Sequence, residues 1–327
     1  MTTMLPAYLA IVFGIALLVF SADKFVEGAA ALAKRLGLPA LLIGMLVIGF
    51  GSSMPEMVIS GLSAWGGNPG LALGNAIGSN ITNIALILGL TAVITPIAVA
   101  SSVLRRELPF LAAVTVLLSA LFYMDGSLSR LDGVLLMLLF SALMAWSIYA
   151  GLKTESDSLA EEVEQVLAKP MTLTRAISYT LGGLIFLVLS SRILVWGGVE
   201  VATHFGVSDL IIGLTIVAIG TSLPELAASV AAVKKGEHDL ALGNVIGSNM
   251  FNSTIVIGIT GMISPTVLEP AMLSRDIPVM AILTGALFVL GYNYRGNENG
   301  VINRFEGSLL LFAYLAYNLG LIYSVTI

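Results

Sequence analysis

The chain of 327 residues contains no cysteine and only two histidines. Without cysteine it can form no disulfide, iron–sulfur cluster or reactive thiol, and two histidines offer little for a soft metal. Charged residues are also scarce, at 11% of the chain against about 25% in an average soluble protein. No motif for a nucleotide, a nucleic acid or a redox cofactor is present. We therefore expect no resident cofactor and no nucleic-acid partner.

Apolar residues make up 57% of the chain, and the mean hydropathy is +0.98. A membrane-spanning helix needs roughly 20 apolar residues. The sequence therefore predicts an all-α, multi-pass protein of the cell membrane, surrounded by the lipid bilayer. The first apolar run, 5–20, has no basic segment before it, so we interpret it as a retained helix and not as a secretory signal. The ten predicted helices lie near residues 5–22, 38–63, 70–94, 104–123, 129–151, 173–196, 207–233, 239–263, 276–294 and 305–325.

One segment of the chain occurs twice. Residues 43–96 align without a gap with residues 212–265, and 22 of the 54 positions are identical. Apolar composition alone would not maintain such a register, so the chain is an internal duplication. We expect a first five-helix repeat at 1–151, an acidic cytoplasmic linker at 152–172 and a second five-helix repeat at 173–327.

The positive charges predict that the second repeat is inverted in the membrane. If the N-terminus faces outside, twelve Lys and Arg residues fall on the inside, and only Arg130 and Arg275 fall in outside loops. This positive-inside bias predicts an N-out/C-out topology. Because each repeat has an odd number of helices, the second repeat enters the membrane in the opposite orientation. Many secondary transporters have this architecture, with the substrate site near the midplane.

Each repeat carries one glutamate within apolar sequence. Glu56 ends the motif GFGSSMPE and Glu225 ends AIGTSLPE, so each glutamate follows two hydroxyl residues and a proline. Proline and glycine should break the helix here, and a break inside the membrane is stable only beside protein, a cavity or an ion. The freed carbonyls, the hydroxyls and the carboxylates together form a set of hard oxygen ligands. The hydroxyl residues are Ser52, Ser53, Thr221 and Ser222.

A second motif, GNxIGSNxxN, occurs at 74–83 and 243–252. In each copy the serine and the last asparagine are four residues apart and share one helix face. They can present a hydroxyl and an amide oxygen toward the glutamates, while the glycines allow close helix packing. The middle asparagine of each copy is open to either a structural role or a ligand role. The serines and last asparagines are Ser79, Asn83, Ser248 and Asn252, and the middle asparagines are Asn80 and Asn249.

Such oxygen ligands prefer hard cations. Flexible coordination by about six to eight oxygens favours Ca²⁺ over Mg²⁺, and two carboxylates neutralise one Ca²⁺. The neutral oxygens suit Na⁺. One site could therefore hold either Ca²⁺ or several Na⁺ but not both fully, which is the basis of antiport.

The residues alone leave three other functions open: an H⁺/Ca²⁺ antiporter, a passive cation channel and an intramembrane hydrolase with an acid pair. A purely structural role for the glutamates is disfavoured. Of the twenty acidic residues only Glu56 and Glu225 lie at mid-span, and both follow the same kind of break.

Four further motifs have simpler interpretations. The dipeptides 106–107 and 275–276, Arg-Glu and Arg-Asp, are related by the repeat and predict interfacial ion pairs. The segments SRLDG at 129–133 and NRFEG at 303–307 predict capped helix starts.

At the motifs GSSMPE, GTSLPE and the paired GNxIGSN, the sequence resembles the sodium/calcium exchanger family, and its prokaryotic members in particular, over the whole chain. The resemblance implies a Na⁺/Ca²⁺ antiporter that works by alternating access and is electrogenic. It implies Ca²⁺ between Glu56 and Glu225, with help from backbone carbonyls near Gly49 and Ala218. The sodium ligands that it implies are Ser52, Ser53, Ser79, Thr221, Ser222 and Ser248, with Asn83 and Asn252 lining the same centre.

The chain departs from some family members at one of these positions. Members that include the potassium-dependent branch have aspartate where this chain has Asn252, which argues against potassium co-transport and leaves the cation stoichiometry open. The first and sixth predicted helices lack buried acids and are therefore candidates for moving elements.

Overall fold

The computed structural model describes residues 4–35, 52–99, 107–153, 171–207, 209–234, 238–291 and 300–326, and most of them are helical. Position 49 and the predicted linker from 154 to 170 lie outside these ranges. Within the described residues, six helices are long and apolar enough to cross a membrane. They are Pro69–Ile94, Leu108–Asp125, Leu173–His204, Ala241–Ile263, Met272–Leu290 and Arg304–Tyr323.

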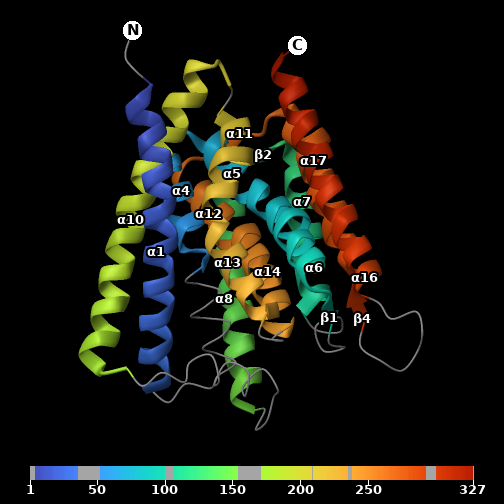
Figure 1. Cartoon of the computed structure of the whole chain (residues 1–327). Coiled ribbons are helices and arrows are strands. Elements are labelled where there is room, and N and C mark those ends of the chain that lie inside the picture. The colour runs from blue at the N-terminus through green and yellow to red at the C-terminus, as the bar shows by residue number, and fades with distance from the viewer. Residues whose placement is uncertain are drawn as a thin grey trace.

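The described helices of the first half fall on the stretches that hydropathy predicts, although the first helix extends well beyond its predicted end (Figure 1). They are α1 (Leu5–Arg35), α4 (Met54–Trp65), α5 (Pro69–Ile81), the π-helical turn η2 (Thr82–Leu88), α6 (Gly89–Ile94), α7 (Leu108–Asp125) and α8 (Arg130–Lys153).

The second half repeats this order and contains three π-helical turns. Its elements are α10 (Leu173–His204), α11 (Asp209–Ile212), η4 (Gly213–Val217), α12 (Ala218–Thr221), α13 (Leu223–Lys234), α14 (His238–Phe251), η5 (Asn252–Val256), α15 (Ile257–Ile263), η6 (Met272–Asp276), α16 (Ile277–Leu290) and α17 (Arg304–Thr326).

The first helices of the two halves, α1 and α10, run side by side in opposite directions along one side of the molecule (Figure 1). Their backbones approach closely at two glycines that occupy equivalent repeat positions. A Cβ on Gly28 would lie 2.6 Å from the Thr180 nitrogen, and one on Gly197 would lie 2.8 Å from the Ala7 oxygen. Only glycine fits at such distances, so these positions fix where the two helices cross.

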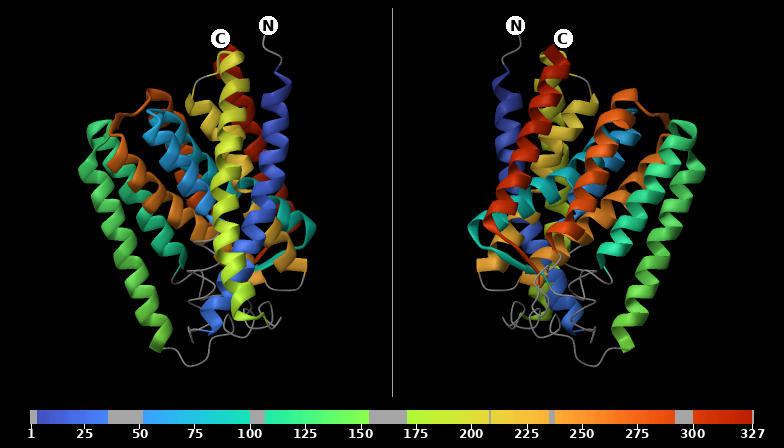
Figure 2. Two further views of the ribbon diagram at one scale, coloured as in Figure 1. Left: turned by 90° about the vertical axis from the view of Figure 1, so that its left-hand side faces the viewer. Right: turned by 90° about the vertical axis from the view of Figure 1, so that its right-hand side faces the viewer.

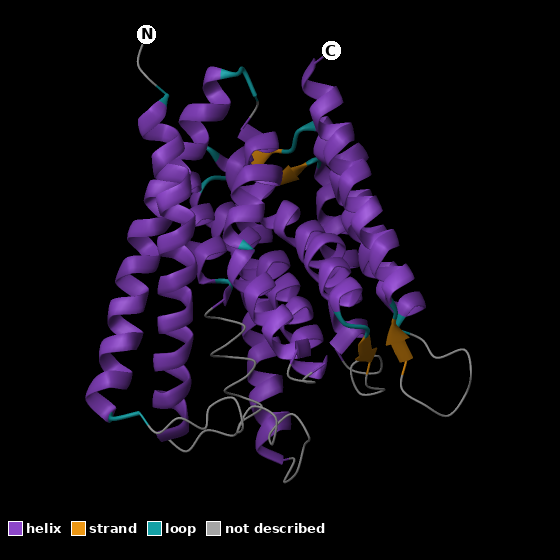
Figure 3. Ribbon diagram, in the orientation of Figure 1, coloured by secondary structure: helices purple, strands orange, loops and turns teal. Residues whose placement is uncertain are grey.

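Two short antiparallel ladders connect the halves, one at each end of the bundle (Figure 3). Strand β1 (Ile97–Val99) of the first half pairs with β4 (Gly300–Ile302) of the second. At the opposite end, β2 (Ser127–Leu128) of the first half pairs with β3 (Thr266–Val267) of the second. Each ladder therefore joins one strand from each half.

The last helix of each half packs on the other half, again through glycines. A Cβ on Gly307 of α17 would lie 2.8 Å from the Gly89 oxygen on α6, and one on Gly133 of α8 would lie 2.8 Å from the Gly258 oxygen on α15. Figure 2 shows α8 inclined to the α1–α10 pair, on the opposite side of the molecule. The two halves are therefore interlocked and do not form separate bodies.

The predicted helix starts at SRLDG and NRFEG are confirmed. The Ser129 nitrogen donates to Asp132 Oδ2 at 2.8 Å, while the Asp132 nitrogen donates back to Ser129 Oγ at 3.2 Å. The Asn303 nitrogen donates to Glu306 Oε2 at 2.8 Å, and the Glu306 nitrogen donates to Asn303 Oδ1 at 3.0 Å. Both are reciprocal capping boxes, which satisfy the free N–H groups of the first turn.

The predicted pair at 275–276 is also confirmed, because Arg275 Nε lies 2.7 Å from Asp276 Oδ1. This aspartate is fully buried and also accepts a hydrogen bond of 3.0 Å from the Tyr317 hydroxyl of α17. Asp276, the last residue of η6, thus connects this turn to α17. In the first half, the arginine of the equivalent pair, at 106, lies outside the described residues.

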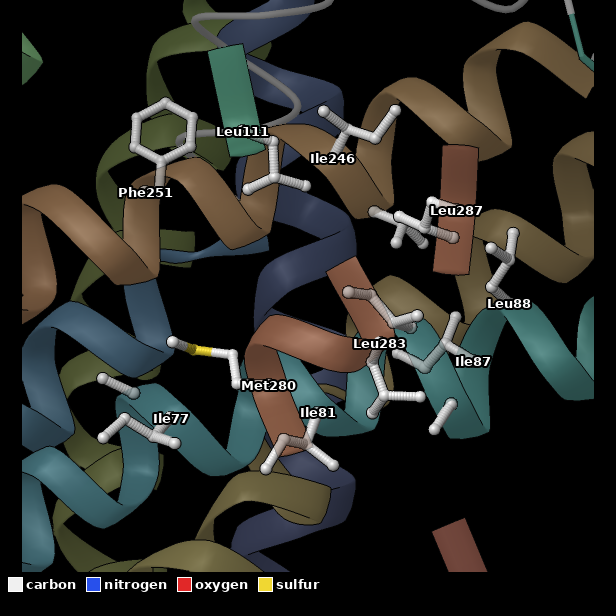
Figure 4. Close-up of a cluster of buried hydrophobic side chains, with 14 of the residues drawn as sticks. Ile77, Ile81, Ile87, Leu88, Leu111, Ile246, Phe251, Met280, Leu283 and Leu287 are labelled. Atoms are coloured by element: carbon white, nitrogen blue, oxygen red, sulfur yellow. The ribbon is translucent and has the colours of Figure 1, made fainter. Parts of the chain in front are cut away.

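The core consists of aliphatic side chains from both halves. Figure 4 shows Ile77, Ile81, Ile87 and Leu88 of α5 and η2 packed among side chains of α14 and α16. The outer helices instead expose apolar side chains, as expected for surfaces that contact lipid tails. Examples are Val116 on α7, Leu138 on α8 and Phe312 on α17, which are exposed by 68%, 60% and 69%.

The contact between α8 and α15 provides a stability test. In Gly133→Val the new Cβ would also lie 2.8 Å from the Met262 nitrogen, so the two helices must separate. Overpacking of this kind costs about 1–3 kcal/mol. We expect a lower thermal midpoint in detergent for this variant. Gly285→Ala is the matched control, because a Cβ there meets nothing within 4 Å. An equal loss in both variants would contradict the close helix contact.

Candidate functional site

The predicted helix breaks are present in both halves, directly before Met54 and Leu223. Ser53 has φ −85° and ψ 1°, and Ser222 has φ −86° and ψ 3°, values that lie outside the α-helical region. Each break lies two residues before a proline, which has no N–H to continue the helix. A new helix begins after each break, α4 in the first half and α13 in the second.

The two glutamates lie in the first turns of these new helices, and both are completely buried. A helix N-terminus carries partial positive charge and favours a carboxylate. Neither Glu56 nor Glu225 forms an ion pair with a Lys or Arg among the described residues, yet the two carboxylates are close enough to interact electrostatically. Two buried negative charges therefore face each other with only neutral partners, an arrangement that is costly without a cation.

Hydroxyl groups reach the carboxylates from the adjoining segments. Ser222 Oγ donates to Glu56 Oε1 at 3.4 Å, and Ser248 Oγ donates to Glu225 Oε1 at the same distance. The first of these bonds crosses from the second half to the first. The glutamate of the first half is thus held partly by the break of the second half.

Asn75 and Asn244 form the symmetric framework of the site. Asn75 Nδ2 donates to the backbone oxygen of Glu56 at 3.4 Å and to Ser60 Oγ at 2.9 Å. The equivalent amide of Asn244 donates to the backbone oxygen of Glu225 and to Ser229 Oγ, both at 3.3 Å. These two asparagines therefore hold the backbone of both glutamates.

The same two asparagines also connect the halves. Thr221 Oγ1 donates to Asn75 Oδ1 at 3.2 Å, and Ser52 Oγ donates to Asn244 Oδ1 at 3.3 Å. Each asparagine thus joins the glutamate of its own half to a hydroxyl of the other. Their role was not predicted from the sequence, although their recurrence with Ser60 and Ser229 at equivalent positions was a usable signal.

Four of the predicted hydroxyls meet in pairs across the interface between the halves. Ser79 Oγ lies 3.3 Å from Thr221 Oγ1, and Ser52 Oγ lies 3.5 Å from Ser248 Oγ. The backbone oxygen of Ala218 accepts a hydrogen bond of 3.2 Å from Thr221 Oγ1 and one of 3.1 Å from the Ser222 nitrogen. Of the predicted site residues only position 49 lies outside the described residues. Hydrogen bonds join the hydroxyls of Ser52, Ser79, Thr221, Ser222 and Ser248 to the glutamates or to one another.

The two terminal asparagines of the second motif lie at π-helical turns. Asn83 is the second residue of η2, and Asn252 is the first residue of η5. A π turn widens the helix locally, and such turns are frequent at functional sites. Both asparagines are fully buried. Nothing in the sequence indicated these turns.

Several buried oxygens of the site have no hydrogen-bond partner, although buried polar groups are usually paired. The described residues contain no cluster of three or more His, Cys, Asp or Glu side chains, so the site combines two carboxylates with neutral oxygens. This combination fits a dehydrated hard cation better than a transition metal. The unpartnered oxygens are Ser53 Oγ, Glu56 Oε2, Asn83 Oδ1, Glu225 Oε2 and Asn252 Oδ1.

The asparagine framework can be tested separately from the glutamates. Asn75→Ala removes the bonds to the Glu56 backbone and to Thr221, so the site should lose its alignment while keeping both charges. Groups that orient ligands typically contribute about 10- to 100-fold in cation affinity. We expect the half-saturating Ca²⁺ concentration for uptake to rise by about tenfold or more, and Asn244→Ala to behave alike. Ser63→Ala is the control, because the Ser63 hydroxyl has no partner. An unchanged Ca²⁺ dependence in the asparagine variants would contradict the role.

Comparison with known proteins identifies the class of this site. The family model described as sodium/calcium exchanger protein matches residues 6–149 and 175–323, which include both halves. The chain belongs to the sodium/calcium exchanger family. It is therefore a multi-pass membrane antiporter of the cation/Ca²⁺ type and belongs to a family of transporters, not of enzymes.

Individual relatives support the same conclusion. CaxA of Alkalimonas amylolytica is 45% identical over 315 residues, which cover 96% of this chain and 98% of CaxA. The sodium/calcium exchanger MaX1 of Methanosarcina acetivorans is 30% identical over 350 residues, which cover 97% of this chain and 98% of MaX1. A structure of the sodium-calcium exchanger NCX_Mj, soaked with 10 mM Na⁺ and 10 mM Sr²⁺, matches with a TM-score of 0.70 and 28% identity. It covers 96% of this chain and 98% of NCX_Mj.

Proposed function

We propose that the protein is an electrogenic Na⁺/Ca²⁺ antiporter of the cell membrane that works by alternating access. The observation that carries this proposal is the pair of fully buried carboxylates, Glu56 and Glu225, which are surrounded by neutral oxygens from both halves. MaX1 is described as a sodium/calcium exchanger, and NCX_Mj as a sodium-calcium exchanger. Ca²⁺ and Na⁺ are thus the substrates, and the protein needs no cofactor.

The ligand chemistry explains why two ions would compete. One Ca²⁺ would neutralise both carboxylates, and backbone carbonyls near 49 and 218 would complete its oxygen shell. Na⁺ would use the hydroxyls of the two breaks and of the second motifs, together with the carboxylates. Without any cation the two buried charges would be costly to move through the membrane interior. The site would therefore reorient mainly when occupied, which couples the two ion fluxes.

The proposed topology has ten membrane helices in two inverted repeats, 1–151 and 173–327, with an inside linker at 152–172 and both termini outside. Two features support it. The first turn of α1 and the last turn of α17 lie at the same end of the bundle (Figure 1). The two inter-half ladders lie at opposite ends, as an inverted repeat requires.

We propose the α1–α10 pair as the moving element. Its two crossing glycines face each other's helix and not the site, and a Cβ on Gly14 would lie 3.1 Å from the Leu194 nitrogen. The remaining helices are tied together by ladders and glycine contacts between the halves. Because α1 and α10 pack closely against each other and lie beside an interlocked bundle, the two helices can move as one unit.

The deciding experiment is uptake of radiolabelled Ca²⁺ into proteoliposomes loaded with Na⁺, beside K⁺-loaded and acid-loaded controls. We expect uptake to require internal Na⁺ and to increase when the membrane potential favours the net charge movement. Uptake driven only by a proton gradient would instead assign an H⁺/Ca²⁺ antiporter. Uptake that ignores both gradients would contradict the proposal and indicate a passive channel.

A further inference from the structure

The middle asparagines of the two GNxIGSNxxN motifs break the symmetry of the site. Asn249 Oδ1 accepts a 2.9 Å hydrogen bond from Asn83 Nδ2. Asn249 Nδ2 donates to the backbone oxygen of Asn80 at 3.3 Å. Asn249 thus contacts both the side chain and the backbone of the first half. Its repeat counterpart Asn80 makes neither of the equivalent contacts.

Asn80 instead points to other partners. Its Nδ2 donates to Ser253 Oγ at 2.7 Å and to Met280 Sδ at 3.4 Å. Figure 4 shows Met280 of α16 beside the helix that carries Ile77 and Ile81. Asn80 Oδ1 has no partner, although the side chain is only 1% exposed.

The hydrogen bond that symmetry predicts here is missing. The counterpart of the Asn83–Asn249 bond would run from Asn252 Nδ2 to Asn80 Oδ1, and both of these atoms are buried without partners. The bonds of Asn75 and Asn244, by contrast, occur in both halves. The missing bond therefore marks one local difference between the halves. A second one lies at the glutamates, where Ser222 donates to Glu56 but its counterpart Ser53 Oγ has no partner.

The partners of Asn80 explain why only this asparagine can turn away. The counterparts of Ser253 and Met280 in the first half are Ile84 and Leu111, whose aliphatic side chains cannot accept a hydrogen bond. The repeat register holds at this point, because Thr115 and Thr284 donate in the same way to the oxygens of Leu111 and Met280. Asn249 therefore has no equivalent partner if it releases Asn83.

In an inverted repeat, exchanging the local conformations of the two halves converts a site that faces one side into a site that faces the other. From this, and resting on the proposed antiport, we infer that Asn80 and Asn249 are positioning residues that exchange roles during transport. In the opposite orientation Asn80 accepts from Asn252, and Asn249 releases Asn83. Ser253 and Met280 hold the Asn80 side chain away from Asn252 and so stabilise the orientation of the site that this structure shows.

The absence of native cysteine allows a direct test of this exchange. Met54 and Leu223 occupy equivalent half-buried positions at the two breaks, so Met54→Cys and Leu223→Cys, made in separate proteins, are matched reporters. Their reaction rates with a maleimide are measured on purified protein in detergent, in buffer without Na⁺ or Ca²⁺. The ratio of the two rates reports the balance between the two orientations.

Ser253→Ala removes the shorter bond of Asn80, and we expect the two rates to move in opposite directions, changing their ratio by about fivefold, the effect of one average hydrogen bond. Met280→Leu, which installs the first-half residue, should shift the ratio in the same direction by a smaller factor. Thr254→Val is the control on the same π turn, because the Thr254 hydroxyl donates only to the Met250 oxygen of its own helix.

An unchanged ratio in Ser253→Ala, or an equal change in Thr254→Val, would overturn the exchange. Parallel changes of both rates would also overturn it, because they would indicate local loosening and not a shift between orientations. The measurement uses no ion gradient. It therefore gives an answer even if the uptake experiment assigns a different coupling ion or a channel.

Discussion

Na⁺-driven Ca²⁺ uptake is expected to fall by at least about 100-fold in Glu56→Gln, and by a similar factor in Glu225→Gln. Each substitution removes one of the two buried charges that would neutralise a divalent cation. Removing one partner of a buried ionic interaction costs about 3–5 kcal/mol. The two effects should be similar because the carboxylates occupy equivalent first turns and are equally buried.

The same variants should lose uptake without losing thermal stability. In the absence of cations a neutral glutamine avoids burying an unpaired charge, so the thermal midpoint should equal or exceed that of the unmodified protein. Added Ca²⁺ should raise the midpoint of the unmodified protein by mass action and leave the variants unchanged. Glu306→Gln, in the capping box of α17, is the control and should keep both uptake and Ca²⁺ stabilisation. A glutamine variant with full uptake would contradict the proposed role of the glutamates.

Asn252→Asp is expected to lower the half-saturating Ca²⁺ concentration by about tenfold. Both amide atoms of Asn252 are buried without partners, so no hydrogen bond is lost when the amide becomes a carboxylate. A third negative charge near a divalent cation contributes up to about 4 kcal/mol at an effective dielectric constant near 20, and desolvation offsets part of this. The measurement is Ca²⁺ uptake as a function of external Ca²⁺.

Asn83→Asp is the matched control at the equivalent position. Its amide donates to Asn249 Oδ1 at 2.9 Å, and a carboxylate would place two oxygens against each other. We expect a smaller gain in affinity and a lower thermal midpoint than in Asn252→Asp. Equal behaviour of the two variants would show that the difference between the halves has no energetic consequence.

The repeated motifs predicted the centre of the molecule well. A proline preceded by two hydroxyl residues has only a few structural consequences inside a membrane, and the break before Met54 and Leu223 is the expected one. The recurrence of the glutamates at equivalent positions also predicted that both would be buried together. Local chemistry and symmetry were sufficient for these features because each depends on a few adjacent residues.

Other features depend on contacts that no local pattern contains. The π turns at Asn83 and Asn252 arise where helices from both halves meet, and the sequence of either turn resembles ordinary helix. The different partners of Asn80 and Asn249 depend on Ser253 and Met280, which come from two separate elements. The interlocking of the halves likewise required the glycine contacts of α8 and α17.

This interlocking has a consequence for synthesis of the chain. The first half cannot reach its final packing when it leaves the ribosome, because Gly89 on α6 is covered by Gly307, Leu310 and Leu311 of α17, and β1 pairs with β4. Both partners belong to the segment 300–326 of the second half, so this later segment completes the packing of the first half. A chain that stops before Gly300 would leave the edge of β1 unpaired and the glycine surface of α6 uncovered. Quality-control proteases that sample incomplete membrane proteins would therefore recognise such a truncated chain by its first half.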